Sequence, residues 1–201
     1  MKILLLTHER ELIRASNTGT IALTYAPLIV ERIVWQRVSP DARLTELIEN
    51  NQALLLYQKK STDINGRGST HSGNVDSTTV PPATVTAESE GCNFTPPVVT
   101  STSTADNSIS TSTAMIEAFA NIIIIDSTWQ ESRKIYNKSP YLKNTPCVSL
   151  TTGRTSAYRL RRNQVLGGLC TIECIIEVLT IKGEHELASK LSVEYGRFNQ
   201  Q

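Results

Sequence analysis

Length, composition and charge narrow the class of protein before any motif is considered. The chain has 201 residues, 39% of them hydrophobic, and a formal net charge of +1 at pH 7. One domain is therefore the default expectation, and the balanced charge excludes a strong overall field for nucleic acid, so any basic surface has to be local. No apolar run is long enough to span a membrane, and the short run Ile3–Leu6 cannot form a signal-peptide core. We expect a soluble, cytoplasmic protein without membrane contact.

Short apolar runs alternate with helical patterns along most of the chain. Strands are expected at residues 2–7, 33–38, 53–57, 121–125 and 148–150. Helices are expected at residues 11–25, 44–50, 128–137, 171–182 and 184–195. Continuous apolar strands that alternate with helices are typical of an α/β fold, so we predict a mostly parallel sheet with helices on both faces.

Residues 61–114 differ from the rest of the chain. Ser and Thr occupy 22 of these 54 positions, and apolar periodicity is almost absent. Such a segment buries too little apolar surface to offset the entropy of ordering it. We therefore expect one domain over residues 1–201 that contains a disordered, low-complexity insertion at 61–114. The remaining core of roughly 145 residues is close to the commonest domain size.

The isoleucine run at residues 122–125 ends in the polar sequence DSTW, which begins at Asp126. Thr128 and Glu131 have the spacing of a capping box, so a helix is expected to begin at or just after Thr128. Asp126 then lies at the carboxyl end of a central strand, where parallel α/β sheets bind ligands. The alternative is structural: Asp126 and Thr128 only cap the helix, and Trp129 packs in the core.

The four cysteines form no C-x-x-C pair, which gives a structural zinc site little support. Cys170 and Cys174 lie one helical turn apart in an apolar context, and we interpret them as buried free thiols. We expect no bound metal.

Motifs spread over nearly the whole core resemble those of the DTW-domain family. They are His8-Glu9, Arg14, Ser16–Gly19, Leu54–Tyr57, Asp126–Glu131, Arg133-Lys134, Ser139-Pro140, Tyr158–Arg162 and Cys170–Glu173. The resemblance implies transfer of the 3-amino-3-carboxypropyl group of S-adenosyl-L-methionine to N3 of a uridine in tRNA. It also implies a SPOUT-like fold with a trefoil knot in the C-terminal half. The chain departs from many members in lacking a cysteine-rich segment before the first strand, and in carrying the long Ser/Thr-rich insertion.

The resemblance and the predicted strand ends together suggest a role for each motif residue. Asp126 is the expected catalytic residue, which removes the N3 proton or orients the uracil edge. S-adenosyl-L-methionine is expected to contact Asn17, Thr18, Gly19, Tyr57, Thr128, Trp129, Leu150, Thr171 and Glu173. Phosphates of tRNA are expected to contact Arg14, Arg133, Lys134, Arg159, Arg161 and Arg162. No obligate protein partner is expected.

Structural alternatives stay open for several of these residues. Thr171 and Glu173 have the composition of an ordinary helix start, and the basic residues are also typical of a solvated surface. His8, just past a strand end, either meets the donor or caps a turn. Two other functions also remain: a SPOUT-like RNA methyltransferase, which product mass distinguishes, and a non-catalytic RNA-binding module, which needs neither Asp126 nor a donor.

Overall fold

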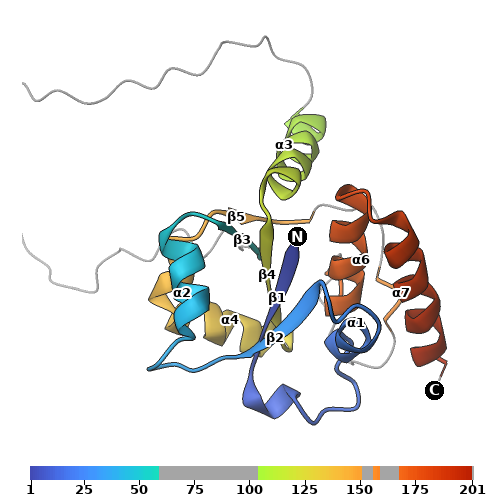
Figure 1. Ribbon diagram of the computed structural model, residues 1–201, viewed down its shortest axis with the longest axis horizontal. Helices are drawn as coiled ribbons and strands as arrows, with labels where there is room; N and C mark the ends of the chain where they lie inside the picture. The colour runs from blue at the N-terminus through green and yellow to red at the C-terminus, as the bar shows by residue number, and fades with distance from the viewer. Residues whose placement is uncertain (59–103, 151–155, 159–167, 201) are drawn as a thin grey trace, which may run out of the picture. The chain divides into compact units, whose positions relative to one another are not determined.

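The computed structural model describes residues 1–58, 104–150, 156–158 and 168–200 (Figure 1). Contacts divide the chain into a unit of residues 1–59 and 104–201 and a second unit of residues 60–103. The second unit lies outside the described residues, so the fold that follows is that of the first unit.

A parallel sheet of five strands forms the centre of the described part of the chain. In spatial order the strands are β2 (Val30–Val34), β1 (Lys2–Thr7), β4 (Asn121–Asp126), β3 (Ala53–Leu56) and β5 (Cys147–Val148). The central strands β1 and β4 pair along their whole length, from Lys2 opposite Asn121 to Thr7 opposite Asp126. Both are continuous apolar runs because both faces of the sheet are buried. The predicted α/β class with a parallel sheet is confirmed.

Alternate side chains of each strand enter separate hydrophobic cores on the two faces of the sheet. The first core contains Ile3, Leu5, Ile122 and Ile124, and the second contains Leu4, Leu6, Ile123 and Ile125. The first face is covered by α1 (Gly19–Tyr25), α3 (Thr104–Ala118), α6 (Thr171–Ile181) and α7 (His185–Phe198). The second face is covered by α2 (Ala42–Glu49), α4 (Trp129–Lys138) and α5 (Pro140–Lys143). We call these faces the α6 face and the α4 face; they lie on opposite sides of the sheet in Figure 1.

The helix predicted at 11–25 is wrong in its first half. Residues Glu9–Glu11 form a short 3-10 helix, η1, and α1 begins only at Gly19. His8 caps η1, since its Nδ1 accepts a hydrogen bond from the Arg10 N–H at 3.2 Å. The buried amide of Asn17 donates to the Glu11 carbonyl at 3.1 Å, which holds the chain between them in a loop. The turn-capping alternative for His8 is therefore confirmed.

The strand predicted at 33–38 is displaced from the observed strand, β2, which lies at an edge of the sheet. Val30 pairs opposite Ile3 and Val34 opposite Thr7, so the register with β1 sets both ends of β2. Its sequence, VERIV, has polar residues at its centre, which weakened the strand pattern. Strand β5 likewise begins one residue before the predicted strand and ends at Val148.

Helix α3 overlaps the end of the range predicted to be disordered, so that prediction is wrong for residues 104–114. The helix is anchored near its carboxyl end. Ile116 is fully buried in the α6-face core, and Met115 and Phe119 pack against the same core. Packing of these apolar residues stabilises a helix whose Ser/Thr-rich sequence does not favour one. The rest of the predicted insertion lies outside the described residues.

The segment between β5 and α6 falls largely on residues 151–155 and 159–167, which are also outside the described residues. The SPOUT-like fold and the trefoil knot therefore stay predictions. Among the helices of the described residues, none combines the length and the apolar character needed to cross a bilayer.

Candidate active site at the carboxyl edge of the sheet

The two central strands end at a topological switch point. After β1 the chain passes to α1 on the α6 face, and after the adjacent strand β4 it passes to α4 on the opposite face. In open parallel α/β sheets, ligands bind beyond the carboxyl ends of strands whose connections diverge in this way. Thr7 and Asp126, the last residues of the two strands, lie opposite each other here. The switch point therefore indicates where a site is expected.

Asp126 is the centre of a buried hydrogen-bond network at this point. Asp126 is buried, with a relative exposure of only 1%. Oδ2 accepts hydrogen bonds from the Thr7 hydroxyl at 3.1 Å and from Asn17 Nδ2 at 2.9 Å. Oδ1 accepts a hydrogen bond from the Thr171 hydroxyl at 2.9 Å. The structure thus brings together three segments that the sequence singled out: the end of the isoleucine run, residues Ser16–Gly19, which we call the SNTG loop, and the start of α6 at Thr171.

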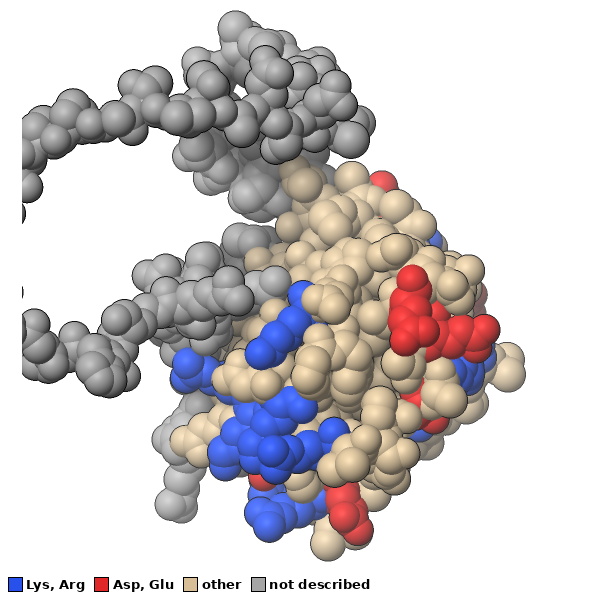
Figure 2. Space-filling view, turned by 90° about the vertical axis from the view of Figure 1, so that its left-hand side faces the viewer, with Lys and Arg blue, Asp and Glu red and all other residues tan. Residues whose placement is uncertain are grey.

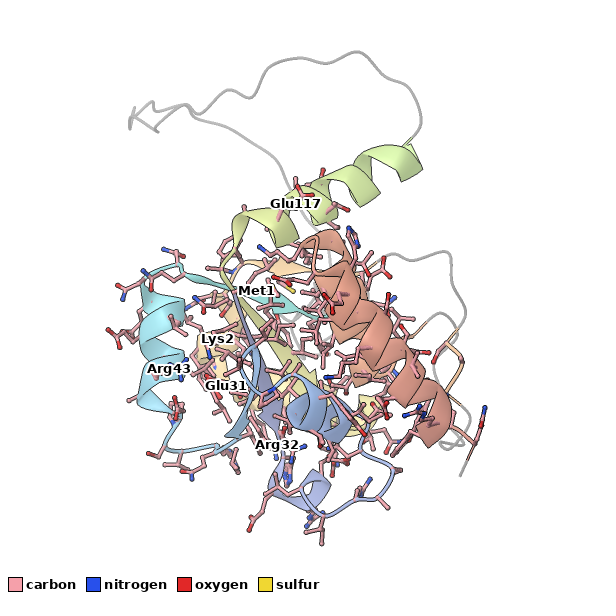
Figure 3. All side chains as sticks on the ribbon, turned by 45° about the vertical axis from the view of Figure 1, so that its right-hand side comes forward. Met1, Lys2, Glu31, Arg32, Arg43 and Glu117 are labelled. Carbon is pink, nitrogen blue, oxygen red and sulfur yellow. The ribbon has the colours of Figure 1, made fainter. Side chains whose placement is uncertain are left out.

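Positive charge also faces the Asp126 carboxylate. Arg32 Nη2 lies 3.6 Å from Oδ2 and donates a hydrogen bond to the Thr20 hydroxyl at 3.3 Å. The neighbouring Glu31 pairs instead with Arg43 of α2 at 2.8 Å, because successive strand residues point to opposite faces (Figure 3). The amino-terminal ends of α1 and α6 also meet the carboxylate, through Gly19 and Thr171, and helix amino termini favour negative charge. Arg32 and the amino-terminal ends of two helices therefore surround this carboxylate with positive charge.

The loop that carries Asn17 and Thr18 is tied to α6. The Thr18 hydroxyl accepts a hydrogen bond from the Ile172 N–H at 3.4 Å. Asn17 is 1% exposed, yet its Oδ1 has no hydrogen-bond partner in the part of the chain that the structure describes. A buried carbonyl oxygen without a partner is destabilising, so it is an available acceptor for an N–H group of a ligand.

Glu173 has four hydrogen-bond donors around its carboxylate. Oε2 accepts from the Cys170 N–H at 2.8 Å and from the Ser156 hydroxyl at 2.5 Å. Oε1 accepts from the Ala157 N–H at 2.8 Å and from the Tyr195 hydroxyl at 3.0 Å. With both oxygens engaged, Glu173 caps α6 and holds residues 156–158 against α6 and α7. These contacts favour the helix-start interpretation over contact with the donor's amine.

Residues 156–158 connect this cap to the SNTG loop. The buried Tyr158 places its hydroxyl 2.6 Å from the carbonyl oxygen of Ser16, to which it donates a hydrogen bond. The α6 amino terminus, the short segment and the loop beside Asp126 therefore form one hydrogen-bonded unit. Pairing between these motifs was not predicted, since nothing local in the sequence links Tyr158 to Ser16.

Cys170 and Cys174, near this unit, are free thiols, as predicted, although both residues are partly rather than fully buried. Burial, with the nearby Glu173 carboxylate as the second cause, raises the pKa of Cys170 to about 11. Burial also raises the pKa of Cys174, with Cys170 as the next cause. Since the thiolate is the reactive form, neither cysteine has the surroundings of a catalytic nucleophile.

The remaining predicted donor contacts are divided between the two faces. The Thr128 hydroxyl accepts from the Glu131 N–H at 3.3 Å, which confirms that α4 begins just after Thr128. Trp129, the first residue of α4, is partly buried. Tyr57 is buried on the α4 face and stacks on Tyr136 with ring centroids 4.4 Å apart. Leu150 packs against the core of the opposite face. Their contacts with a donor stay predictions.

A comparison with protein families bears directly on this arrangement of motifs. The family description DTW domain matches residues 1–201. The chain belongs to the DTW-domain family. Membership in this family is consistent with a tRNA-modifying transferase. No solved structure matches this DTW-domain chain.

The predicted RNA contacts of this DTW-domain protein are described only in part. Arg133 and Lys134 are exposed on α4, on the side of the molecule where Lys and Arg gather in Figure 2. Arg14 is exposed and pairs with the buried Glu11 at 2.9 Å. Arg159, Arg161 and Arg162 lie outside the described residues, so their roles stay predictions.

Two residues of the Asp126 network were missed by the sequence reasoning. Thr7, like Asp126, is a polar residue that ends an apolar strand, so its position at the carboxyl edge of the sheet was a signal for it. Arg32 has no such signal. It reaches Asp126 because β2 pairs with β1, and only the register of the sheet determines this contact.

Proposed function

We propose that this DTW-domain protein transfers the 3-amino-3-carboxypropyl group of S-adenosyl-L-methionine to N3 of a uridine in tRNA. The observation that carries the proposal is the convergence of Asn17, Asp126 and Thr171 at the switch point of the sheet. Three family motifs, far apart in the sequence, supply these residues. Membership in the DTW-domain family, which is consistent with tRNA modification, supports the same assignment.

The donor poses a problem of orientation. The sulfonium of S-adenosyl-L-methionine activates three carbons, so the protein has to present the aminocarboxypropyl arm to the acceptor and turn the methyl group away. The donor's amine and adenine carry N–H groups, and the unpaired Asn17 Oδ1 is an acceptor that fits such a group. Of the other residues expected to contact the donor, Thr18 and Gly19 lie at the start of α1, Thr128 and Trp129 at the start of α4, and Thr171 and Glu173 in the first turn of α6.

The contacts of Asp126 favour positioning over proton removal. Three side-chain donors and Arg32 already engage its two oxygens, and the residue is almost fully buried. A general base has to come within hydrogen-bond reach of the proton it removes, and a residue only 1% exposed is poorly placed for that approach. We propose that Asp126 holds the SNTG loop and the α6 amino terminus in the geometry that binds the donor. Proton removal by Asp126 remains the competing hypothesis.

The transfer is tested with unmodified tRNA, S-adenosyl-L-methionine and the purified protein, followed by mass spectrometry of the nucleosides. A donor-dependent uridine adduct with the mass of the aminocarboxypropyl group supports the proposal. An adduct with the mass of a methyl group instead supports a SPOUT-like methyltransferase. Binding of tRNA without any adduct supports a non-catalytic RNA-binding module.

The role of Asp126 is tested with Asp126→Asn, after circular dichroism has shown that the variant folds. A positioning role predicts a raised KM for the donor and an unchanged pH profile of kcat. Loss of kcat together with loss of its acidic limb would support proton removal instead. A folded variant with wild-type kcat and KM would exclude both roles.

A further inference from the structure

The helix pairs α4–α5 and α6–α7, on opposite faces of the sheet, carry opposite net charge. Residues 129–143, which form α4 and α5, include one acidic residue, Glu131, and four basic residues, Arg133, Lys134, Lys138 and Lys143. Residues 171–198, which form α6 and α7, include five acidic and three basic residues. All four basic residues of α4 and α5 are exposed, and Figure 2 shows Lys and Arg side chains gathered on this side of the molecule. The positive charge is therefore local, in a chain whose net charge is close to zero.

The basic residues follow one another along the two helices. Lys134 and Lys138 are one turn apart on α4, a spacing that puts their Cβ atoms about 5–6 Å apart on one side of the helix. Ser139 lies between α4 and α5 as the residue that caps both, and Lys143 is the last residue of α5. We call Lys134, Lys138 and Lys143, together with Arg133, the α4–α5 basic surface.

A pair of aromatic rings connects this surface to the edge of the sheet where Asp126 lies. The Trp35 indole N–H donates to the hydroxyl of the buried Ser139 at 2.8 Å, at the junction of α4 and α5. The Trp35 backbone N–H donates to the Thr7 carbonyl at 2.8 Å, and the Thr7 hydroxyl donates to Asp126. The ring of His8 lies against Trp35, with centroids 5.4 Å apart and planes inclined by 33°. Both rings are partly exposed.

We propose that the α4–α5 basic surface binds the phosphate backbone of the RNA substrate, and that the His8–Trp35 pair stacks on a base beside the target uridine. Phosphate contacts supply affinity without sequence information, whereas aromatic stacking holds unpaired bases. Lys138, Lys143, His8 and Trp35 are thereby assigned to RNA binding. The inference rests on the proposed function for its class of substrate, and it does not depend on which group is transferred.

An acidic lipid surface would also attract these cations, but the surroundings favour RNA. Proteins that lie on a membrane surface insert apolar side chains between the basic ones. Among the described residues, the large hydrophobic side chains that are exposed all lie outside residues 129–143. The surface is therefore charged and polar, and its aromatic neighbours lie at the carboxyl edge of the sheet, where β1 and β4 end.

The phosphate contacts are tested by fluorescence anisotropy with an unmodified tRNA transcript and the full chain, over a series of KCl concentrations. The double variant Lys138→Ala/Lys143→Ala is expected to bind roughly ten-fold or more weakly at low salt, and to lower the slope of log K against log salt by about 1.5. The matched control is Lys190→Ala, an exposed lysine of α7 on the other face, which is expected to stay within about two-fold of wild type. An unchanged slope in the double variant, or an equal loss in the control, would overturn the phosphate contact.

The stacking contact is tested with Trp35→Leu and Trp35→Phe. Trp35→Leu is expected to weaken binding about five-fold or more with an unchanged salt slope, because stacking involves no counterion release. Trp35→Phe keeps a ring without the indole N–H, so it is expected to restore most of the affinity if it folds. Equal binding by all three proteins would overturn the stacking role, and so would an equal loss in both variants when thermal unfolding shows that Trp35→Phe is intact.

Binding to vesicles of phosphatidylserine and phosphatidylcholine separates lipid from RNA. Charge-dependent binding to these vesicles without binding to the tRNA transcript would overturn the inference. Failure of the proposed RNA-binding surface can also be distinguished from failure of the proposed transfer reaction. A protein that binds tRNA through this surface but forms no adduct contradicts only the transfer. A double variant that forms the adduct with a wild-type salt slope contradicts only the basic surface.

Discussion

Gly19 lies directly against the carboxylate of Asp126. A Cβ atom on residue 19 would be 2.8 Å from Asp126 Oδ2 and 2.9 Å from both Oδ1 and Cγ, closer than non-bonded atoms approach. Gly19 is the first residue of α1, so the missing side chain lets the amino-terminal end of the helix reach the charged group. The glycine is thus required by a close approach between two segments, and its own φ angle is not the reason.

Gly19→Ala is expected to destabilise the protein by about 1–3 kcal/mol, because the added methyl group displaces the Asp126 carboxylate from its partners. Urea unfolding followed by circular dichroism measures the change. Gly196→Ala is the matched control, since a Cβ there meets no atom within 4 Å. Within helix α7 this substitution is expected to stabilise the protein by about 0.5–1 kcal/mol. Wild-type stability of Gly19→Ala would contradict the close approach.

Thr171→Val removes the hydroxyl that donates to Asp126 Oδ1 and keeps the shape of the side chain. The loss of one hydrogen bond to a buried carboxylate is expected to lower the free energy of unfolding by about 1.5–3 kcal/mol. Thr180→Val, measured in parallel by urea unfolding, removes an exposed hydroxyl that donates to the Ile176 carbonyl in the same helix. Its effect is expected to be below about 0.5 kcal/mol. Equal losses of stability in the two variants would contradict a stabilising hydrogen bond from Thr171 to Asp126.

Glu173→Gln is expected to loosen residues 156–158, because an amide has one acceptor oxygen in place of the two that accept from Ala157, Ser156, Cys170 and Tyr195. Hydrogen exchange measured by mass spectrometry should become faster at the amides of Ala157 and Tyr158. The control is Glu177→Gln, one turn further along α6. Exchange that is unchanged in Glu173→Gln, or equally accelerated in the control, would show that the carboxylate does not hold this segment.

The raised pKa of Cys170 predicts slow alkylation of the folded protein. With a pKa of about 11, roughly one thiol in a thousand is ionised at pH 8. Iodoacetamide labelling, read by peptide mass spectrometry, should accelerate as the pH rises toward 11. It should be much faster at pH 8 in urea, where burial and the Glu173 carboxylate no longer act. Because the folded state keeps the proton more tightly, this thiol's contribution to the free energy of unfolding is fully present below its unfolded pKa. That contribution is lost as the pH rises toward the folded pKa of about 11. Equal labelling rates at pH 8 with and without urea would contradict the burial of this thiol.

Local sequence was enough to predict the central strands and the start of α4. The runs at Lys2–Thr7, Ala53–Leu56 and Asn121–Asp126 are apolar because both faces of the sheet are covered, and that pattern is visible in any short window. Thr128 was identified as a cap because a cap and its partner are only three residues apart. The position of Asp126 at the carboxyl edge followed from these two predictions together.

The ends of the edge strand β2 and the existence of α3 were harder to predict, because both depend on contacts with distant residues. The ends of β2 depend on its pairing with β1, and α3 depends on the burial of Ile116 against a core built from distant residues. Neither interaction is present within a short window of sequence. Local alternation therefore placed the strand at residues 33–38 instead of Val30–Val34, and composition predicted disorder for residues 104–114.

What the sequence determined by itself was a set of buried strands, their caps and the family motifs that follow them. Only the tertiary structure decided which motif residues meet. The hydrogen bonds from Asn17 and Thr7 to Asp126 join residues 109 and 119 positions apart. Such bonds form only in the folded chain, because the strand register brings Thr7 and Arg32 to the carboxylate, and the packing of α6 on the sheet brings Thr171 there.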